Sequence, residues 1–186
     1  MELYEYEKKP LKRLRSALAE CTVLLKRNGD FPLAEAGNIA AYGNGVRKTI
    51  KGGTGSGEVN SRYFVTVEQG LKDAGFTITT NAWLDAYDTT YVAARKQFLA
   101  DIKAEAKAKH TMAILYGKVM PEPEYRLPLD GAGDTAIYVV ARNSGEGNDR
   151  NPVGGDIKLT ATEKRDILEL NRKYAKFMLV INTGGV

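Results

Sequence analysis

Apolar residues recur along this chain in two patterns, one typical of buried strands and one typical of amphipathic helices. Strands are predicted by short apolar runs at 38–43 (NIAAYG), 76–81 (FTITTN), 135–142 (TAIYVVAR) and 176–185 (KFMLVINTGG). Except for 76–81, which alternates and is rich in β-branched residues, these runs are continuously apolar. Continuous apolar runs are typical of strands that are buried on both faces of a sheet. We therefore expect four strands, three of them fully buried.

Helical spacing of apolar residues marks further segments. They cover residues 11–29, 62–75, 89–109 and 160–175. The first ends on Asn28-Gly29, a common helix stop, and the last opens with Thr160 and Glu163, which have the spacing of a capping box. Between the third helix and the strand at 135–142, prolines predict a loop without regular structure: Pro121, Pro123 and Pro128.

Because strands and helices alternate, we predict an α/β fold: a mostly parallel sheet with helices on both faces, in a three-layer α/β sandwich. The 186 residues suffice for one domain, which would bury roughly 70% of its unfolded surface. We divide it into a helical lead-in at 1–29 and a sheet core at 38–186. Functional groups in such sheets gather at the carboxyl ends of the strands. The segments that follow strands here are polar and glycine-rich: GNGVRKTIKGGTGSGEVN, NSGEGNDR and NTGGV.

Composition narrows the class of protein. With 43% hydrophobic and 27% charged residues, the chain has the make-up of a soluble globular protein. Its net charge of +4 is small, and the basic residues near the amino terminus alternate with Leu11, Leu14 and Leu18. This pattern favours the solvated face of an amphipathic helix. It argues against nucleic-acid binding, which usually concentrates basic residues on one face.

Targeting and metal-binding signals are absent from the sequence. No run approaches the ~18 apolar residues of a membrane span, and the charged amino terminus lacks a signal-peptide core. We therefore expect a cytoplasmic protein without a membrane partner. Cys21 is the single cysteine and His110 the single histidine, so an internal disulfide or a multi-Cys or multi-His metal site cannot form. We expect neither a metal ion nor another cofactor.

The glycine-rich segment 51–58, KGGTGSGE, lies between a predicted strand and a predicted helix, where a nucleotide-binding loop would lie. A phosphate loop needs Lys and Ser/Thr directly after its second glycine, but Glu58 and Val59 follow Gly57. The dinucleotide fingerprint fails as well, because Lys48 takes the place of its third glycine. Two interpretations remain: a close-packed loop at the sheet edge, or a loop beside a neutral ligand or a neighbouring domain.

The segment 144–150, SGEGNDR, places Glu146 between two glycines directly after the clearest strand. In one interpretation it is a surface turn, in which Asp149 and Arg150 pair and Glu146 is solvated. In the other, the glycines let the loop project Glu146 into a cleft, where partial desolvation raises its pKa toward that of a general acid. Asp149 and Arg150 would then support the loop. The local chemistry favours the turn, because one carboxylate is not an acid/base pair.

Five segments, taken in order, resemble one known domain. They are LLKRNGDFPL (24–33), IAAYGNGVRKTIKGGTGSGEVN (39–60), GLKDAGF (70–76), YVVARNSGEGNDRNPVGGDIKLTATE (138–163) and LVINTGGV (179–186). In this order they resemble the α/β-sandwich domain of glycoside hydrolase family 3, as it occurs in β-glucosidases. In that family a (β/α)₈ barrel supplies an aspartate nucleophile, and the sandwich supplies the acid/base glutamate in an S-G-E-G-x-D-R context. The resemblance therefore implies that Glu146 is the general acid/base.

The same resemblance implies the rest of the functional assignment. The segment Gly53, Thr54, Gly55 and Ser56 would line the mouth of the substrate pocket, and the reaction would be retaining hydrolysis of β-linked glucosides or short oligosaccharides. That reaction needs two carboxyl groups about 5–5.5 Å apart, and the chain offers one candidate. The barrel of the same enzyme is therefore an expected partner, and the isolated chain is expected to be inactive. Because the family's sandwich continues after a strand like that at 179–186, we expect the amino-terminal part of the domain, with a sheet incomplete at its carboxyl end.

Other functions stay open at this point. A non-catalytic module with a flavodoxin- or Rossmann-like sheet would use the glycine-rich segment to hold a nucleotide or a sugar. A scaffold domain would only dock on partners and would tolerate substitution of Glu146. The oligomeric state is open too, and a homodimer is compatible with the sequence.

Overall fold

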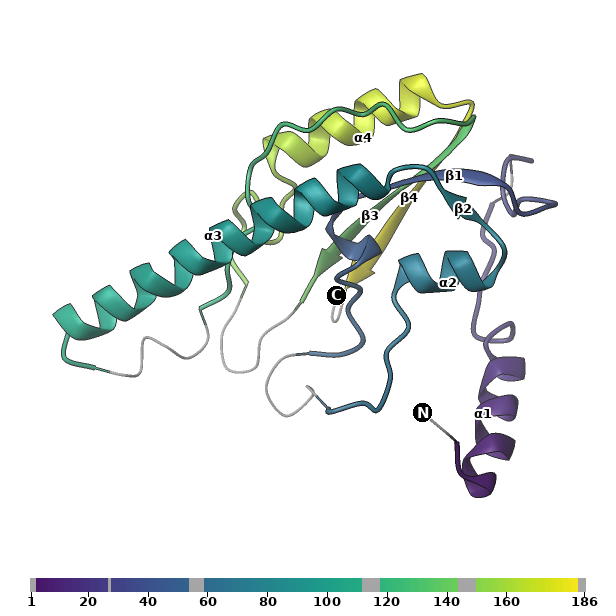
Figure 1. Ribbon diagram of the computed structural model, residues 1–186, viewed down its shortest axis with the longest axis horizontal. Coiled ribbons are helices and arrows are strands. Elements are labelled where there is room, and N and C mark those ends of the chain that lie inside the picture. Colours follow the sequence, from purple (N-terminus) through teal and green to yellow (C-terminus); the bar gives the residue numbers. More distant parts are fainter. Residues whose placement is uncertain (1–2, 27, 54–58, 112–117, 144–149, 184–186) are drawn as a thin grey trace. The chain divides into compact units, whose positions relative to one another are not determined.

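The computed structural model of the chain describes residues 3–26, 28–53, 59–111, 118–143 and 150–183. The chain divides into two compact units, Met1–Glu35 and Ala36–Val186. The described part of the first unit holds helix α1, and the second unit holds the sheet with its covering helices (Figure 1). Both segments that we expect to carry function belong to the second unit.

Helix α1 covers Glu5–Ala17, so the helix predicted at 11–29 is wrong in both bounds. It begins earlier, where the Glu7 carboxylate accepts a hydrogen bond from the Tyr4 backbone N–H at 2.9 Å. None of its residues is buried.

All four predicted strands form, and in the described residues they make one parallel sheet. They are β1 (Asn38–Tyr42), β2 (Thr77–Ile78), β3 (Thr135–Arg142) and β4 (Lys176–Thr183). The strands lie in the order β2-β1-β3-β4, and every neighbouring pair is parallel. Tyr42 at the end of β1 lies opposite Tyr138, while β3 and β4 pair along their whole length. The prediction of an α/β fold with a parallel sheet is therefore confirmed.

The two inner strands are buried on both faces, as predicted. Residues 39–42 of β1 and 135–141 of β3 are all buried. The prediction of a buried strand at 176–185 is wrong. β4 lies at the sheet edge and its burial alternates, with Leu179 and Ile181 exposed by 39% and 67%. A continuous apolar run therefore does not by itself distinguish an edge strand from an inner strand.

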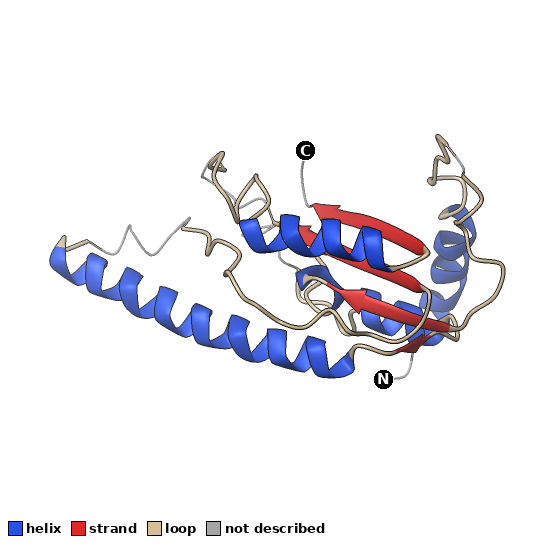
Figure 2. Ribbon diagram, turned by 90° about the horizontal axis from the view of Figure 1, so that it is seen from above, coloured by secondary structure: helices blue, strands red, loops and turns tan. Residues whose placement is uncertain are grey.

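Helices cover both faces of the sheet. In the described part of the second unit they are α2 (Val67–Asp73), α3 (Asn81–Ala108) and α4 (Ala161–Lys173). α2 lies on one face, whereas α3 and α4 lie on the other (Figures 1 and 2). This arrangement confirms the predicted sandwich. None of the described helices is long and apolar enough to cross a membrane.

The helix boundaries follow from capping. α2 is shorter than the predicted 62–75 because Thr66 caps it, accepting from the Gln69 N–H at 3.1 Å. α4 begins at the predicted capping box: the Glu163 N–H donates to Thr160 Oγ1 at 3.0 Å, and the Thr160 N–H donates to Glu163 Oε2 at 2.8 Å. α3 begins eight residues before the predicted Thr89.

Aromatic side chains pack α3 onto the sheet. Tyr42 on β1 meets Trp83 edge to face with ring centroids 5.3 Å apart, and Trp83 stacks on Tyr87 at 5.6 Å. Tyr125 meets the Trp83 and Tyr87 rings edge to face, at 5.7 and 5.4 Å. Because Tyr125 lies in the loop between α3 and β3, this cluster holds the loop on the core. Where it is described, at 118–134, that loop contains no helix or strand, as its prolines predict.

Candidate functional site

The carboxyl ends of β1, β3 and β4 lie at the same edge of the sheet because the strands are parallel (Figure 2). From β1 the chain turns through Gly43 into a short 3₁₀ helix, η1 (Asn44–Val46). Gly43 has a φ of +90°, and a Cβ at this position would lie 2.4 Å from the Val139 carbonyl oxygen. The turn out of β1 thus runs directly against the β3 backbone, an approach that glycine allows.

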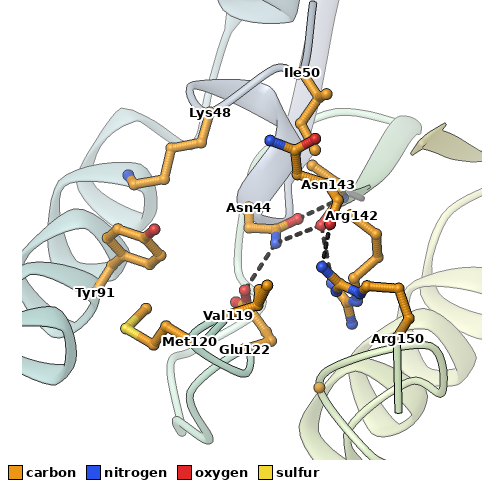
Figure 3. Close-up of a pocket in the computed structure, with 12 residues that line it drawn as sticks. Asn44, Lys48, Ile50, Tyr91, Val119, Met120, Glu122, Arg142, Asn143 and Arg150 are labelled. Atoms are coloured by element: carbon orange, nitrogen blue, oxygen red, sulfur yellow. Dashed lines mark hydrogen bonds between the residues drawn. The ribbon is translucent and has the colours of Figure 1, made fainter. Parts of the chain in front are cut away.

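At this edge a cavity of about 230 Å³ lies between the strand ends, α3 and the loop before β3 (Figure 3). Its lining combines polar and charged side chains with apolar groups such as Val119 and Met120, and it comes from segments that are far apart in the sequence. The lining residues include Asn44, Lys48, Ile50, Tyr91, Glu122, Arg142, Asn143 and Arg150. The cavity therefore collects the first residues that follow β1 and β3.

The Asn44 side chain joins the ends of β1 and β3. Its Oδ1 accepts from the Ala141 backbone N–H at 2.7 Å, and its Nδ2 donates to the Ala141 carbonyl at 3.1 Å. Nδ2 also donates to Glu122 Oε2 at 2.8 Å. The carboxamide thus satisfies both backbone groups of one β3 residue, as a neighbouring strand would.

Glu122, in the loop before β3, is held by both of its carboxyl oxygens. The Tyr87 hydroxyl donates to Oε1 at 2.5 Å and Asn44 donates to Oε2, while the Glu122 backbone N–H donates to the Gly155 carbonyl at 2.9 Å. Burial raises the pKa of Glu122 above its usual value, and the nearby Glu163 carboxylate raises it further, against the lowering effect of the two side-chain hydrogen bonds. Because both oxygens are engaged inside the protein, Glu122 is suited to holding Asn44 rather than to acting on a substrate.

The side-chain carboxamide of Asn182 joins β4 to the residues that lead from β1 into the glycine-rich segment. We call the described residues next to each predicted functional segment its stem. The Ile50 backbone N–H donates to Asn182 Oδ1 at 2.5 Å, and Asn182 Nδ2 donates to the Ile50 carbonyl at 3.1 Å. Ile50 lies three residues before Gly53. The chain that leaves β1 is therefore fixed to β4 as well as to β3.

Charged side chains join the two described ends of the segment after β3. Arg150 donates to the Asn143 carbonyl through Nη1 and pairs with Asp156 through Nε. The Asp156 carbonyl accepts from Arg142 Nε at 2.7 Å, and Arg142 Nη2 pairs with Glu163 at 2.6 Å. These contacts connect the segment to the end of β3 and to the first turn of α4.

Lys48 lines the side of the cavity next to α3. Its ammonium group pairs with Asp88 and lies 4.7 and 5.3 Å from the ring centroids of Tyr91 and Tyr87. The carboxylate and the aromatic faces all favour the charged amine. The Lys48 ammonium group therefore lies beside the cavity, and the Asp88 carboxylate balances its charge.

The structure brings the two predicted segments together through their stems. Gly53 and Arg150 are described, and both are partly buried. The predicted residues that lie outside the described part of the chain are Thr54, Gly55, Ser56, Glu146 and Asp149. Ile50 on one stem and Asn143 and Arg150 on the other line the same cavity. In the described ranges no group of three His, Cys, Asp or Glu residues could hold a metal ion.

The sequence interpretation missed the residues that hold these stems together: Asn44, Glu122, Asp156 and Asn182. Asn44 and Asn182 had a recognisable signal, since each is an amide residue at the carboxyl end of a strand. Glu122 had no such signal, because it lies between two prolines in an irregular loop and its partner Tyr87 is 35 residues away.

Comparison with known proteins supports this architecture. The sequence model of the glycosyl hydrolase family 3 C-terminal domain matches residues 22–186. Beta-glucosidase A of Butyrivibrio fibrisolvens is 28% identical over 199 aligned residues, which cover 91% of this chain and 22% of that protein. The beta-glucosidase of Ruminococcus albus is 27% identical over 188 residues, which cover 95% of this chain and 18% of that protein. The chain thus spans about a fifth of the length of these curated relatives.

Solved structures agree with the sequence comparison. Beta-glucosidase 3B from Thermotoga neapolitana in complex with alpha-D-glucose has a TM-score of 0.66 and 29% identity, and the match covers 96% of this chain and 24% of that chain. A structure of the same protein in complex with glycerol has a TM-score of 0.65. The family match covers most of the chain, and the fold is the same. The chain therefore belongs to the glycosyl hydrolase family 3 C-terminal domain family.

Proposed function

We propose that this chain is the acid/base-bearing domain of a β-glucosidase-like enzyme, which hydrolyses β-linked glucosides or short oligosaccharides with retention of configuration. Glu146 is the general acid/base, and a (β/α)₈ barrel domain of the same enzyme supplies the aspartate nucleophile. The mouth of the substrate pocket is lined by Gly53, Thr54, Gly55 and Ser56. The family of the chain and the names of its relatives support this proposal.

The observation that carries the proposal is the convergence of two stems on one cavity. Ile50 precedes the glycine-rich segment, whereas Asn143 and Arg150 flank the segment that contains Glu146. All three residues line the cavity of about 230 Å³ at the carboxyl edge of the sheet (Figure 3). This edge is where ligand-binding groups gather in parallel α/β sheets.

The proposed reaction divides the work between two carboxyl groups. Glu146 protonates the leaving oxygen while the barrel aspartate attacks the anomeric carbon, which forms a covalent glycosyl-enzyme. Glu146, now ionised, then removes a proton from the water that hydrolyses this intermediate. The acid must therefore be protonated when substrate binds, and the nucleophile must be ionised.

The other predicted residue roles concern the shape of the loop. Asp149 and Arg150 support the segment that carries Glu146. Arg150 makes two contacts suited to this role, one to the Asn143 carbonyl and one to Asp156. Asn44 and Asn182 hold the neighbouring stem through their two-point bonds to Ala141 and Ile50.

Replacement of Glu146 by Ala in the full-length natural protein tests the proposal. Loss of a general acid should lower kcat/KM for phenyl β-glucoside by about 10²–10⁴-fold. The loss should be much smaller for 2,4-dinitrophenyl β-glucoside, because its leaving group departs without protonation.

Glu105→Ala is the control, because Glu105 is an acid on α3 that pairs with Lys109 and Lys118 away from the cavity. This variant should leave the ratio of the two kcat/KM values unchanged. An equal loss on both glucosides in Glu146→Ala, or no loss on either, would contradict the proposal.

A further inference from the structure

A chain of contacts closes the base of the segment between Asn143 and Arg150. Arg150 reaches across it, because its Nη1 donates to the Asn143 carbonyl while its Nε pairs with Asp156 Oδ1. The other carboxylate oxygen of Asp156, Oδ2, accepts from the Asn151 backbone N–H at 2.8 Å. One carboxylate thus binds both the Arg150 side chain and the next backbone amide.

Asp156 is itself anchored to the core through its backbone. Its backbone carbonyl accepts from Arg142 Nε at 2.7 Å, and Arg142 Nη2 pairs with Glu163 Oε2 at 2.6 Å. The same Glu163 oxygen accepts from the Thr160 N–H at 2.8 Å, so the anchor ends at the first turn of α4. Asp156 is 8% exposed and Glu163 is 1% exposed, which removes both carboxylates from solvent competition.

The contacts of Arg150 fix the positions of the two chain ends at Asn143 and Arg150 rather than adding much to stability. A buried ion pair contributes little to stability over a well-packed apolar pair, because desolvation of the charges offsets their attraction. Arg150 nevertheless holds two partners at once, because its Nη1 donates to the Asn143 carbonyl while its guanidinium forms an ion pair with Asp156. Asn143 and Arg150 both line the cavity, so the closed base faces the candidate site (Figure 3).

We propose that Asp156 is a positioning residue for the reaction: by holding Arg150, it fixes the two ends of the segment that carries Glu146. The inference rests on the proposed function of Glu146. Asp156 touches no reacting atom and acts through Arg150. Loss of the carboxylate should therefore weaken protonation of the leaving group more than it weakens substrate binding.

Asp156→Asn in the full-length natural protein tests this role, because the amide keeps an acceptor for the Asn151 N–H but loses the charge that binds Arg150. We expect kcat/KM for phenyl β-glucoside to fall about 10- to 100-fold, the size of effect that follows from misplacing a catalytic group. For 2,4-dinitrophenyl β-glucoside the fall should be less than about threefold, since that leaving group needs little protonation. Arg150→Lys should reproduce the difference, because a lysine keeps the charge but cannot bind Asp156 and the Asn143 carbonyl through separate nitrogens.

Glu68→Gln is the matched control, since Glu68 on α2 is a partly buried carboxylate that pairs with Arg47. It should change both kcat/KM values by the same factor. Equal losses on both glucosides in Asp156→Asn, or no loss, would overturn the positioning role while Glu146→Ala still discriminates between leaving groups. If Glu146→Ala itself shows no such discrimination, the proposed function and this inference both fail.

Discussion

The side chain of Asn44 binds both backbone groups of Ala141, accepting from its N–H at 2.7 Å and donating to its carbonyl at 3.1 Å. One side chain therefore continues the contact between the β1 and β3 chains beyond the last backbone pair, Tyr42 and Tyr138. Because Asn44 lies between β1 and the glycine-rich segment, and Ala141 lies just before the segment that contains Glu146, this bond ties the chain leading into one segment to the chain leading into the other.

Asn44→Ala should lower the free energy of unfolding by about 1–3 kcal/mol, because the Ala141 N–H loses its acceptor and Glu122 Oε2 loses its donor. Urea-induced unfolding measures the change. Asn28→Ala is the control, since Asn28 is exposed and its side chain bonds to the neighbouring loop residue Asp30. It should change the free energy by less than about 0.5 kcal/mol. Similar losses in the two variants would contradict the importance of the Asn44 bridge.

Asn182 should protect the Ile50 amide from hydrogen exchange, because the Ile50 N–H donates to Asn182 Oδ1 at 2.5 Å. We expect Asn182→Ala to speed exchange of this amide, while Asn182→Asp, which keeps an acceptor, preserves most of the protection. The Ala41 amide, bonded to Thr80 Oγ1 at 2.9 Å, serves as the internal reference. Unchanged protection at Ile50 in Asn182→Ala would show that the stem is held by other contacts.

Two glycines should respond in opposite ways to alanine. At Gly43 a Cβ would lie 2.4 Å from the Val139 carbonyl oxygen, and φ is +90°. The backbone conformation, with φ +90° and ψ 158°, alone accounts for a loss of about 1–3 kcal/mol in Gly43→Ala, and the clash adds to it. At Gly70, inside α2, nothing lies within 4 Å of a Cβ, so Gly70→Ala should stabilise the protein by about 0.5–1 kcal/mol. Thermal unfolding of the two variants distinguishes these outcomes, and a tolerated Gly43→Ala would contradict the close approach of η1 to β3.

The pKa of Glu122 is raised by burial above its usual value of 4.5. The folded protein therefore holds a proton that the unfolded chain has already released, and stability is lost as pH rises from about 4.5 through the folded pKa. Relative to Glu122→Gln, which has no titrating group, the wild type should lose free energy of unfolding over this window and then level off. The test is how the difference in free energy of unfolding between the two proteins changes with pH. Its absolute size is not the test, because the substitution also changes the strength of the hydrogen bonds from Tyr87 and Asn44, by an amount that does not depend on pH.

Glu124 supplies the contrasting case two residues away. Hydrogen bonds from the Thr162 side chain and backbone, and from the Ala161 N–H, hold the pKa of Glu124 below its usual value. Its contribution to stability is therefore present above the unfolded pKa and is lost as pH falls through the folded pKa. Relative to Glu124→Gln, the wild type should gain stability as pH rises. If the free energy of unfolding of the wild type changed with pH in the same direction relative to both Gln variants, the opposite pKa shifts of Glu122 and Glu124 would be contradicted.

The sheet could be predicted from the sequence because its signals are local. The apolar run at 135–142 indicates a buried strand by its own composition, and the spacing of Thr160 and Glu163 indicates the start of a helix. The start of α3 could not be predicted, because no side chain caps it. The Thr80 hydroxyl bonds to both backbone groups of Ala41 on β1 instead, so a tertiary contact sets the helix start.

The candidate site could be predicted only in part, for the same reason. The carboxyl edge of the sheet follows from the alternation of strands and helices. The contacts that build it join residues that are far apart in the sequence: Asn44 and Ala141 are separated by 97 positions, and Ile50 and Asn182 by 132. Local patterns carry no information on which amide meets which backbone group across such separations.

The central claim is that Glu146 is the acid/base carboxylate of a retaining glycosidase, and chemical rescue by azide tests it most directly. In Glu146→Ala of the full-length natural protein, azide should attack the glycosyl-enzyme formed from 2,4-dinitrophenyl β-glucoside, because it needs no general base and meets no carboxylate. We predict faster turnover with azide and β-glucosyl azide as the product, identified by NMR. No azide product, or the α-anomer that results when a nucleophile has been removed, would contradict the claim.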